Sequence, residues 1–232
     1  MTPSRREFLR TSAAVAATSA VGARILSAGE AYAASPPTPG DPVIKELMQV
    51  ALDVAKASGA SYADVRVAAR RQQNVNTRDK IVQGVSDTDT FGLGVRTLVD
   101  GAWGFAATSV LTADAIAQVT KSAIGQAKAN RASQLRPVIL AATPGNQVGE
   151  WKSPIQTDPF TIPIVDKVAL LLAANEAALK VKQVRQVTSS MFFLREEKTL
   201  MTSDGSYLVQ TIYRTQPSMS VTAVSDDRTD FQ

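Results

Sequence analysis

The 232-residue chain contains neither cysteine nor histidine. Without cysteine, no disulfide can support the fold outside the cytoplasm. Without histidine, the chain cannot form a Ser-His-Asp or Cys-His nucleophilic system, and it lacks the usual ligands of zinc. Only hard, oxygen-liganded ions remain, and the sequence has no Asp-x-Asp-x-Asp-Gly loop to hold one. We therefore expect no metal site within these residues.

The chain also has little excess charge, since its formal net charge at neutral pH is +4. The first 33 residues contain four arginines and two glutamates, so they account for +2 and leave about +2 for the remainder. A nucleic-acid-binding domain usually has a concentrated basic face. Here only Arg70-Arg71 suggests one, and two solvated arginines on an exposed strand explain it better. We expect no nucleic-acid partner.

Residues 1–33 have the layout of a signal peptide. Arg5 and Arg6 stand side by side and are followed by the apolar pair Phe8-Leu9 and by a weakly apolar stretch from Ala13 to Ala23. Paired arginines favour the twin-arginine route, which carries proteins that are already folded. The apolar stretch is shorter than the roughly 20 residues that a membrane-spanning helix needs. We therefore expect no stable membrane span.

The end of this segment resembles a signal-peptidase site. Ala31 and Ala33 flank Tyr32 in a small-x-small pattern, so cleavage would leave Ala34 as the first mature residue. Together with the paired arginines, this pattern predicts export to the periplasm or the extracellular space.

The rest of the sequence divides by composition. We assign residues 34–41 to a proline-rich linker, 42–131 to an amino-terminal α+β domain, 132–162 to a connector and 163–232 to a middle α+β domain that is incomplete. Each α+β segment begins with an amphipathic helix and continues with strands. The expected fold is therefore α+β, with two helix-plus-antiparallel-sheet units in tandem. An old duplication and two generic α+β units explain this similarity equally well.

Local patterns predict the elements of the amino-terminal segment. Asp41 is a good N-cap for a helix that begins at Pro42. Alternating apolar residues from Tyr62 predict strands joined by two tight turns. One is Asp79-Lys80, where a type I′ turn would give Lys80 a positive φ, and the other is Asp100-Gly101, a favoured hairpin dipeptide. Thr112 is placed to cap a second helix.

The second half is harder to assign. The connector contains one candidate strand, Val138-Ile139-Leu140. A helix is expected from Pro163, with Val165, Val168, Leu172 and Leu179 on its buried face. Strands should follow at residues 184–200, 207–214 and 219–224, with a hairpin at Asp204-Gly205.

The segment from Phe91 to Thr108 contains Gly92, Gly94 and Gly104 within strands, which glycine weakens unless another group approaches the backbone closely. This segment, the preceding Tyr62 to Val67 and the following Leu111-Thr112 resemble the amino-terminal region of the TldD/PmbA family. The tail from Ser225 to Gln232 resembles the end of that family's middle region. The resemblance covers residues 42–232.

This resemblance implies a zinc metallopeptidase that acts on extended or unfolded peptides, as a homodimer or as a TldD–PmbA-type heterodimer. In the family, a His-Glu-x-x-x-His helix and a later cysteine hold the zinc in the carboxy-terminal half. No residue of this chain matches those ligands. The resemblance therefore implies no catalytic and no cofactor-binding residue in this chain, and zinc is expected only in that missing half. The chain would then be the scaffold of an exported peptidase. A non-catalytic PmbA-like subunit and a stand-alone peptide-binding module are the alternatives.

Overall fold

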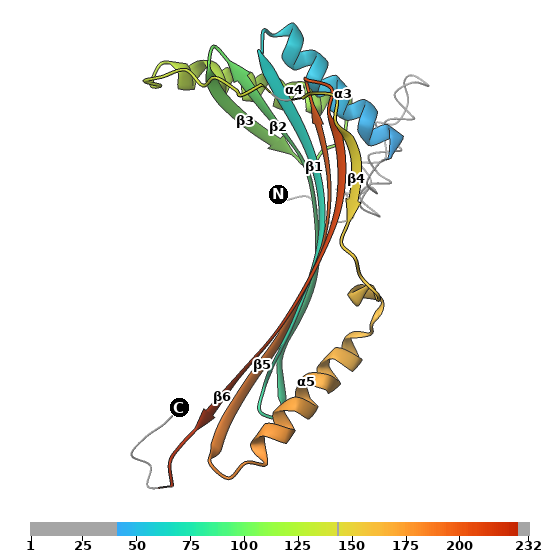
Figure 1. The fold of residues 1–232 in the computed structure, drawn as a ribbon, viewed down its shortest axis with the longest axis vertical. Coiled ribbons are helices and arrows are strands. Elements are labelled where there is room, and N and C mark those ends of the chain that lie inside the picture. The colour runs from blue at the N-terminus through green and yellow to red at the C-terminus, as the bar shows by residue number, and fades with distance from the viewer. Residues whose placement is uncertain (1–40, 143, 227–232) are drawn as a thin grey trace, which may run out of the picture. The chain divides into compact units, whose positions relative to one another are not determined.

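The computed structural model describes residues 41–142 and 144–226 (Figure 1). The predicted export residues Arg5, Arg6, Phe8 and Leu9 lie outside these ranges, as do the cleavage residues Ala31 and Ala33. The elements within them are α3 (Pro42–Ala57), β1 (Tyr62–Arg78), β2 (Ile81–Val99), β3 (Ala102–Thr108), α4 (Ala113–Arg131), β4 (Val148–Lys152), the short 3₁₀ helix η1 (Pro159–Thr161), α5 (Ile164–Leu179), β5 (Val184–Thr202) and β6 (Tyr207–Ala223).

The strands form one mixed sheet in the order β3-β2-β1-β5-β6-β4. The α+β class is confirmed. The two expected units share this sheet, because β1 of the first pairs antiparallel with β5 of the second from Asp64–Thr202 to Arg78–Thr188. A strand has hydrogen-bonding groups on both edges, and β2 satisfies only one edge of β1. Strand β5 satisfies the other, so the two halves become one sheet.

The three α-helices of the described residues, α3, α4 and α5, pack on the same face of this sheet. The alternation along β1 places Ala63, Val65, Gln73 and Thr77 on that face, where they are buried. Figure 1 shows α3 and α4 at one end of the long strands and α5 near the other end. At about 3.3 Å per residue, the 17 residues of β1 extend roughly 55 Å, so one strand can support both helical layers.

Helices α3 and α4 form as their sequences predict. The Asp41 carboxylate accepts a hydrogen bond from the Val43 N–H at 2.9 Å, and the Thr112 hydroxyl accepts one from the Ala115 N–H at 3.2 Å. Six apolar residues at helical spacing along α3 are all buried, namely Ile44, Leu47, Met48, Ala51, Leu52 and Ala55. Capping and apolar periodicity therefore explain both helices without long-range information.

The predicted turns are present, with one local difference. Asp100 and Gly101 have φ values of 50° and 75°, as a type I′ hairpin requires. In the first turn the residue with positive φ is Asp79, at 53°, and not Lys80. The Asp79 carboxylate also accepts a hydrogen bond from the Val187 N–H at 2.8 Å, so a contact with β5 holds this residue in place.

Three expectations for the second half are wrong in detail. The candidate strand Val138–Leu140 is irregular backbone, and the connector's strand is β4, which pairs parallel with β6. The expected break between Arg214 and Met219 is absent, because β6 continues through Pro217. Proline is tolerated there since the outer edge of β6 has no partner strand among the described residues beyond Thr211.

The third error concerns the buried face of α5. Val165 is 69% exposed, whereas Lys167, Leu171 and Asn175 are buried against the sheet. Val168, Leu172 and Leu179 are half-buried beside them. The helix is apolar on most of its circumference, so its apolar residues do not identify the side that faces the sheet.

Two of the strand glycines permit close contacts. A Cβ on Gly104 would lie 1.9 Å from the carbonyl oxygen of Ala123, so α4 can approach β3 only because that side chain is missing. A Cβ on Gly94 would lie 2.8 Å from the ring of Phe105, which packs over this glycine on the face opposite α3, α4 and α5. These contacts explain glycine at positions where it weakens a strand.

Candidate functional site

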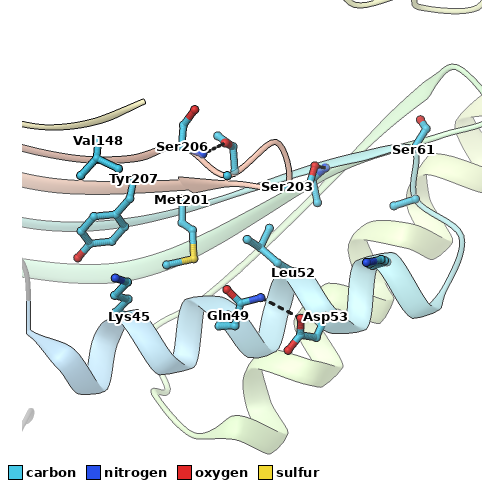
Figure 2. Close-up of a pocket in the computed structure, with 15 residues that line it drawn as sticks. Lys45, Gln49, Leu52, Asp53, Ser61, Val148, Met201, Ser203, Ser206 and Tyr207 are labelled. Carbon is cyan, nitrogen blue, oxygen red and sulfur yellow. Dashed lines mark hydrogen bonds between the residues drawn. The ribbon is translucent and has the colours of Figure 1, made fainter. Parts of the chain in front are cut away.

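A pocket of about 560 Å³ lies between α3 and the turn that joins β5 to β6. Figure 2 shows its lining, with Lys45 and Gln49 on α3 facing Met201 and Tyr207 across the opening. The remaining lining residues are Leu52, Asp53, Lys56, Ala60, Ser61, Ala63, Val148, Thr202, Ser203, Gly205 and Ser206. The volume suits a small ligand or one or two peptide side chains.

The β5–β6 turn, which forms one wall of the pocket, is stabilised by hydrogen bonds within the turn and by contacts with other segments. The Asp204 carboxylate accepts hydrogen bonds from the hydroxyls of Thr202 and Ser206. Gly205 has a φ of 90°, and a Cβ there would lie 2.0 Å from the side-chain oxygen of Asn146. The Ser203 hydroxyl accepts a hydrogen bond from the Ala63 N–H at 3.0 Å, which ties the turn to β1. This wall is therefore built by tertiary contacts and local hydrogen bonds.

The opposite wall is the polar side of α3. The Gln49 amide donates a hydrogen bond to Asp53 at 2.8 Å, and the Lys45 ammonium lies 5.0 Å from the centre of the Tyr207 ring. The Tyr207 hydroxyl is buried and finds no hydrogen-bond partner among the described residues. Burial raises the pKa of this phenol, so it remains a protonated donor at neutral pH. The pocket lining thus contains hydroxyl, amide and ammonium groups, which suit the binding of a polar ligand.

A second polar cluster joins α5 to the sheet. The buried Lys167 ammonium donates a hydrogen bond to Gln73 and lies 4.2 Å from the centre of the Phe193 ring. Burial lowers the pKa of Lys167 below its usual value. Gln73 also donates to Asp87, whose carboxylate receives two hydrogen bonds from Arg71 at 3.0 and 2.8 Å. The hydrogen bond from Arg71 lowers the pKa of Asp87.

The other anchor of α5 is uncharged. Asn175 is fully buried and donates to the Thr77 hydroxyl at 3.0 Å and to the Asp79 carbonyl at 2.9 Å. Its side-chain oxygen accepts a hydrogen bond from the Ser189 hydroxyl at 2.7 Å. Neither Lys167 nor Asn175 was expected at the core from the sequence. Their spacing of eight residues, with Leu171 midway, is the helical signal that was available.

A third cluster lies on the face of the sheet opposite α3, α4 and α5, around the segment that resembles the TldD/PmbA family. Asp64 is buried between two arginines, with Arg96 at 2.7 Å and Arg66 at 3.2 Å. The Arg96 guanidinium stacks 4.4 Å from the centre of the Trp103 ring, and Tyr62 packs against the same ring edge-on at 5.9 Å. These contacts join β1, β2 and β3 and give that end of the sheet a rigid aromatic and charged surface.

No group of three or more Asp, Glu, His or Cys side chains within residues 41–142 and 144–226 is arranged to hold a metal ion. Since the sequence also contains no histidine or cysteine, this donor set does not fit a zinc site. The same part of the chain contains no helix that is both long enough and apolar enough to cross a membrane.

Comparison with family models gives two consecutive matches. The model described as PmbA/TldA metallopeptidase domain 1 matches residues 63–127, and the one described as PmbA/TldA metallopeptidase central domain matches residues 157–232. Together they cover more than half of the chain. The chain belongs to the PmbA/TldD family. A model of the twin-arginine translocation signal matches residues 2–22, which include Arg5, Arg6, Phe8 and Leu9.

Solved structures have the same fold as this family member. A proposed modulator of DNA gyrase from Bacteroides thetaiotaomicron is 20% identical with a TM-score of 0.62, and the match covers 79% of this chain and 42% of that one. A proposed gyrase modulator from Thermotoga maritima is 15% identical with a TM-score of 0.52, covering 78% and 39%. The chain thus spans about two fifths of the length of these structures. A search of curated proteins found no match.

Proposed function

We propose that this chain is the amino-terminal and middle scaffold of an exported TldD-type zinc metallopeptidase that cleaves extended or unfolded peptides. The observation that carries the proposal is the order of the matches, with domain 1 and the central domain following a twin-arginine signal. The described residues do not fit zinc, so the proposal places the zinc ligands in residues outside this sequence. No catalytic step is assigned to this chain's own side chains.

The proposed contribution of this chain is to shape the surface that receives the peptide. Strand β6 pairs with β4 only from Tyr207 to Thr211, so its outer edge from Ile212 to Ala223 has no partner strand among the described residues. Backbone groups on such an edge can bind an extended peptide as an added strand. The same edge favours the second candidate function, a PmbA-like subunit or a peptide-binding module without catalysis.

The test compares the polypeptide that the natural gene encodes with these 232 residues alone. The proposal expects the natural product to contain about one zinc per protomer and to degrade an unfolded protein, such as denatured casein, in a chelator-sensitive way. The 232 residues alone should neither retain zinc nor cleave the substrate.

Cleavage or stoichiometric zinc in the isolated 232-residue chain would overturn the proposal. A natural product without zinc and without cleavage, whose β6 edge still binds unfolded peptides, would establish the binding alternative instead. Peptide binding is measured by fluorescence anisotropy, with Thr215→Pro on β6 as the edge variant and Gly84→Ala on β2 as its control.

A further inference from the structure

The pocket between α3 and the β5–β6 turn is a groove that follows the helix, and we call it the α3 groove. Its lining includes Lys45, Gln49, Asp53 and Lys56, which the helical repeat places on one side of α3. At about 1.5 Å of rise per residue, the distance along the helix from Lys45 to Lys56 is roughly 16 Å. Figure 2 shows Lys45 near one end of this groove and Ser61 near the other.

The centre of the α3 groove has an apolar floor. Leu52, Ala63 and Met201 line the groove, and the body of each side chain is buried in the protein. Figure 2 shows Met201 and Leu52 between Lys45 and Ser61. An aliphatic group that enters the groove at this point leaves water and contacts carbon and sulfur atoms, which is favourable. The floor therefore favours a ligand with an aliphatic group at its middle.

Both ends of the α3 groove carry a positive charge. Among the described residues, neither Lys45 nor Lys56 forms an ion pair. The Lys45 ammonium lies 5.0 Å from the centre of the Tyr207 ring, and this contact restricts its position. Asp53 is the one carboxylate among the lining residues, and it accepts a hydrogen bond from Gln49. The groove is therefore complementary to a ligand with an anionic group at each end.

An extended peptide fits this pattern when its first, third and fifth side chains point into the groove. Alternate residues of a strand lie on one face, and the first and fifth of them are about 13 Å apart. Long, flexible lysine side chains can cover the difference from the roughly 16 Å between their positions on α3. The third side chain then meets the apolar floor, so acidic residues belong at the first and fifth positions and an aliphatic residue belongs between them.

We propose that the α3 groove binds extended peptide segments of the pattern acidic-x-aliphatic-x-acidic, with one carboxylate at Lys45 and the other at Lys56. The inference rests on the proposed function in taking a peptide as the ligand, and it adds which peptides are selected. The groove is a different site from the outer edge of β6, since none of the residues from Ile212 to Ala223 lines it. Side chains identify the peptide in the groove, whereas backbone groups bind it at the strand edge.

The test measures peptide binding by isothermal titration calorimetry. It uses the polypeptide that the natural gene encodes, with a chelator present so that the peptide is not cleaved. The probe is acetyl-Glu-Ser-Leu-Ser-Glu-amide, which should bind saturably and more weakly as salt is added. A peptide with glutamine at both ends should bind about fivefold or more weakly, because both ion pairs are lost. A peptide with serine in place of the central leucine should lose affinity about fivefold or more as well.

Substitutions in α3 then test which side chains bind the probe. Lys45→Gln and Lys56→Gln should each weaken binding about two- to fivefold, since each removes one exposed ion pair. Asp53→Asn should strengthen binding by a similar factor, because it removes a carboxylate that repels the peptide. Lys121→Gln on the exposed side of α4 is the matched control and should leave the affinity unchanged. A general loss of folding cannot produce changes of opposite sign within one helix.

Three results would overturn the proposal. These are no binding of the acidic probe up to about 1 mM, equal affinity for the glutamine peptide, and an affinity that withstands either lysine substitution. Binding that disappears in Thr215→Pro but persists in both lysine variants would place the peptide at the β6 edge, against the groove and in favour of the proposed function. Zinc content and casein cleavage do not enter this test, so failure of the peptidase proposal leaves its result unchanged.

Discussion

Replacing Asn175 by alanine should detach much of α5 from the sheet. The substitution removes two hydrogen bonds donated by the side-chain amide and one accepted from Ser189. At about 1 kcal/mol of net stability for each, the loss is about 3 kcal/mol. Alanine is the better helix former and regains roughly 0.5 kcal/mol, so we expect a net destabilisation of about 2.5 kcal/mol. For a chain of this size the melting temperature should fall by about 5–10 °C.

The assay is urea unfolding followed by circular dichroism, with hydrogen exchange to localise the effect. Backbone amides of α5 should exchange faster in Asn175→Ala, while those of α3 and α4 should not, because these helices pack elsewhere on the sheet. Glu176→Ala is the control, since this exposed neighbour should change stability by less than about 0.5 kcal/mol.

A second variant separates hydrogen bonding from volume. Asn175→Leu keeps the number and branching of the side-chain heavy atoms, but it leaves the Asp79 carbonyl without its side-chain donor. We expect it to remain destabilised by about 1–3 kcal/mol. Full wild-type stability in Asn175→Leu would refute the reasoning. It would show that this position requires a side chain of sufficient volume and not the hydrogen bonds of asparagine.

Two further predictions concern other contacts of the sheet. Gly104→Ala should destabilise the protein by about 1–3 kcal/mol in urea unfolding, because its Cβ would overlap the Ala123 carbonyl. Gly84→Ala, where no atom lies within 4 Å of the new Cβ, should lower the free energy of unfolding by less than about 1 kcal/mol. An equal loss of stability in the two variants would contradict the packing argument. Arg71→Gln should lower stability at pH 7 by about 0.5–1 kcal/mol. Since Arg71 lowers the pKa of folded Asp87, its contribution is complete above the unfolded pKa of about 3.9 and is lost as pH falls through the folded pKa. The two proteins should therefore converge in stability in acid, and a constant difference down to pH 2 would refute this assignment.

The sequence alone determined features that depend on neighbours within a few residues. The caps at Asp41 and Thr112, the core face of α3 and the Asp100-Gly101 hairpin all follow from local hydrogen bonding, side-chain spacing and backbone preference. The resemblance carried by the segment from Phe91 to Thr108 identified the family, which the domain matches confirm. The conclusion that this chain lacks the usual zinc ligands also follows from composition alone, because the sequence contains no histidine and no cysteine.

Only the tertiary structure decided how these pieces combine. Asp64 pairs with Thr202 across the β1–β5 junction, and no local pattern indicates which of several strand edges will meet. Likewise, Asn175 becomes a core residue because Thr77, 98 positions away, supplies its partner. In α5, apolar side chains occur on every side, so periodicity could not select the face. Burial there is decided by hydrogen-bond partners on distant strands, which form only once the sheet has assembled.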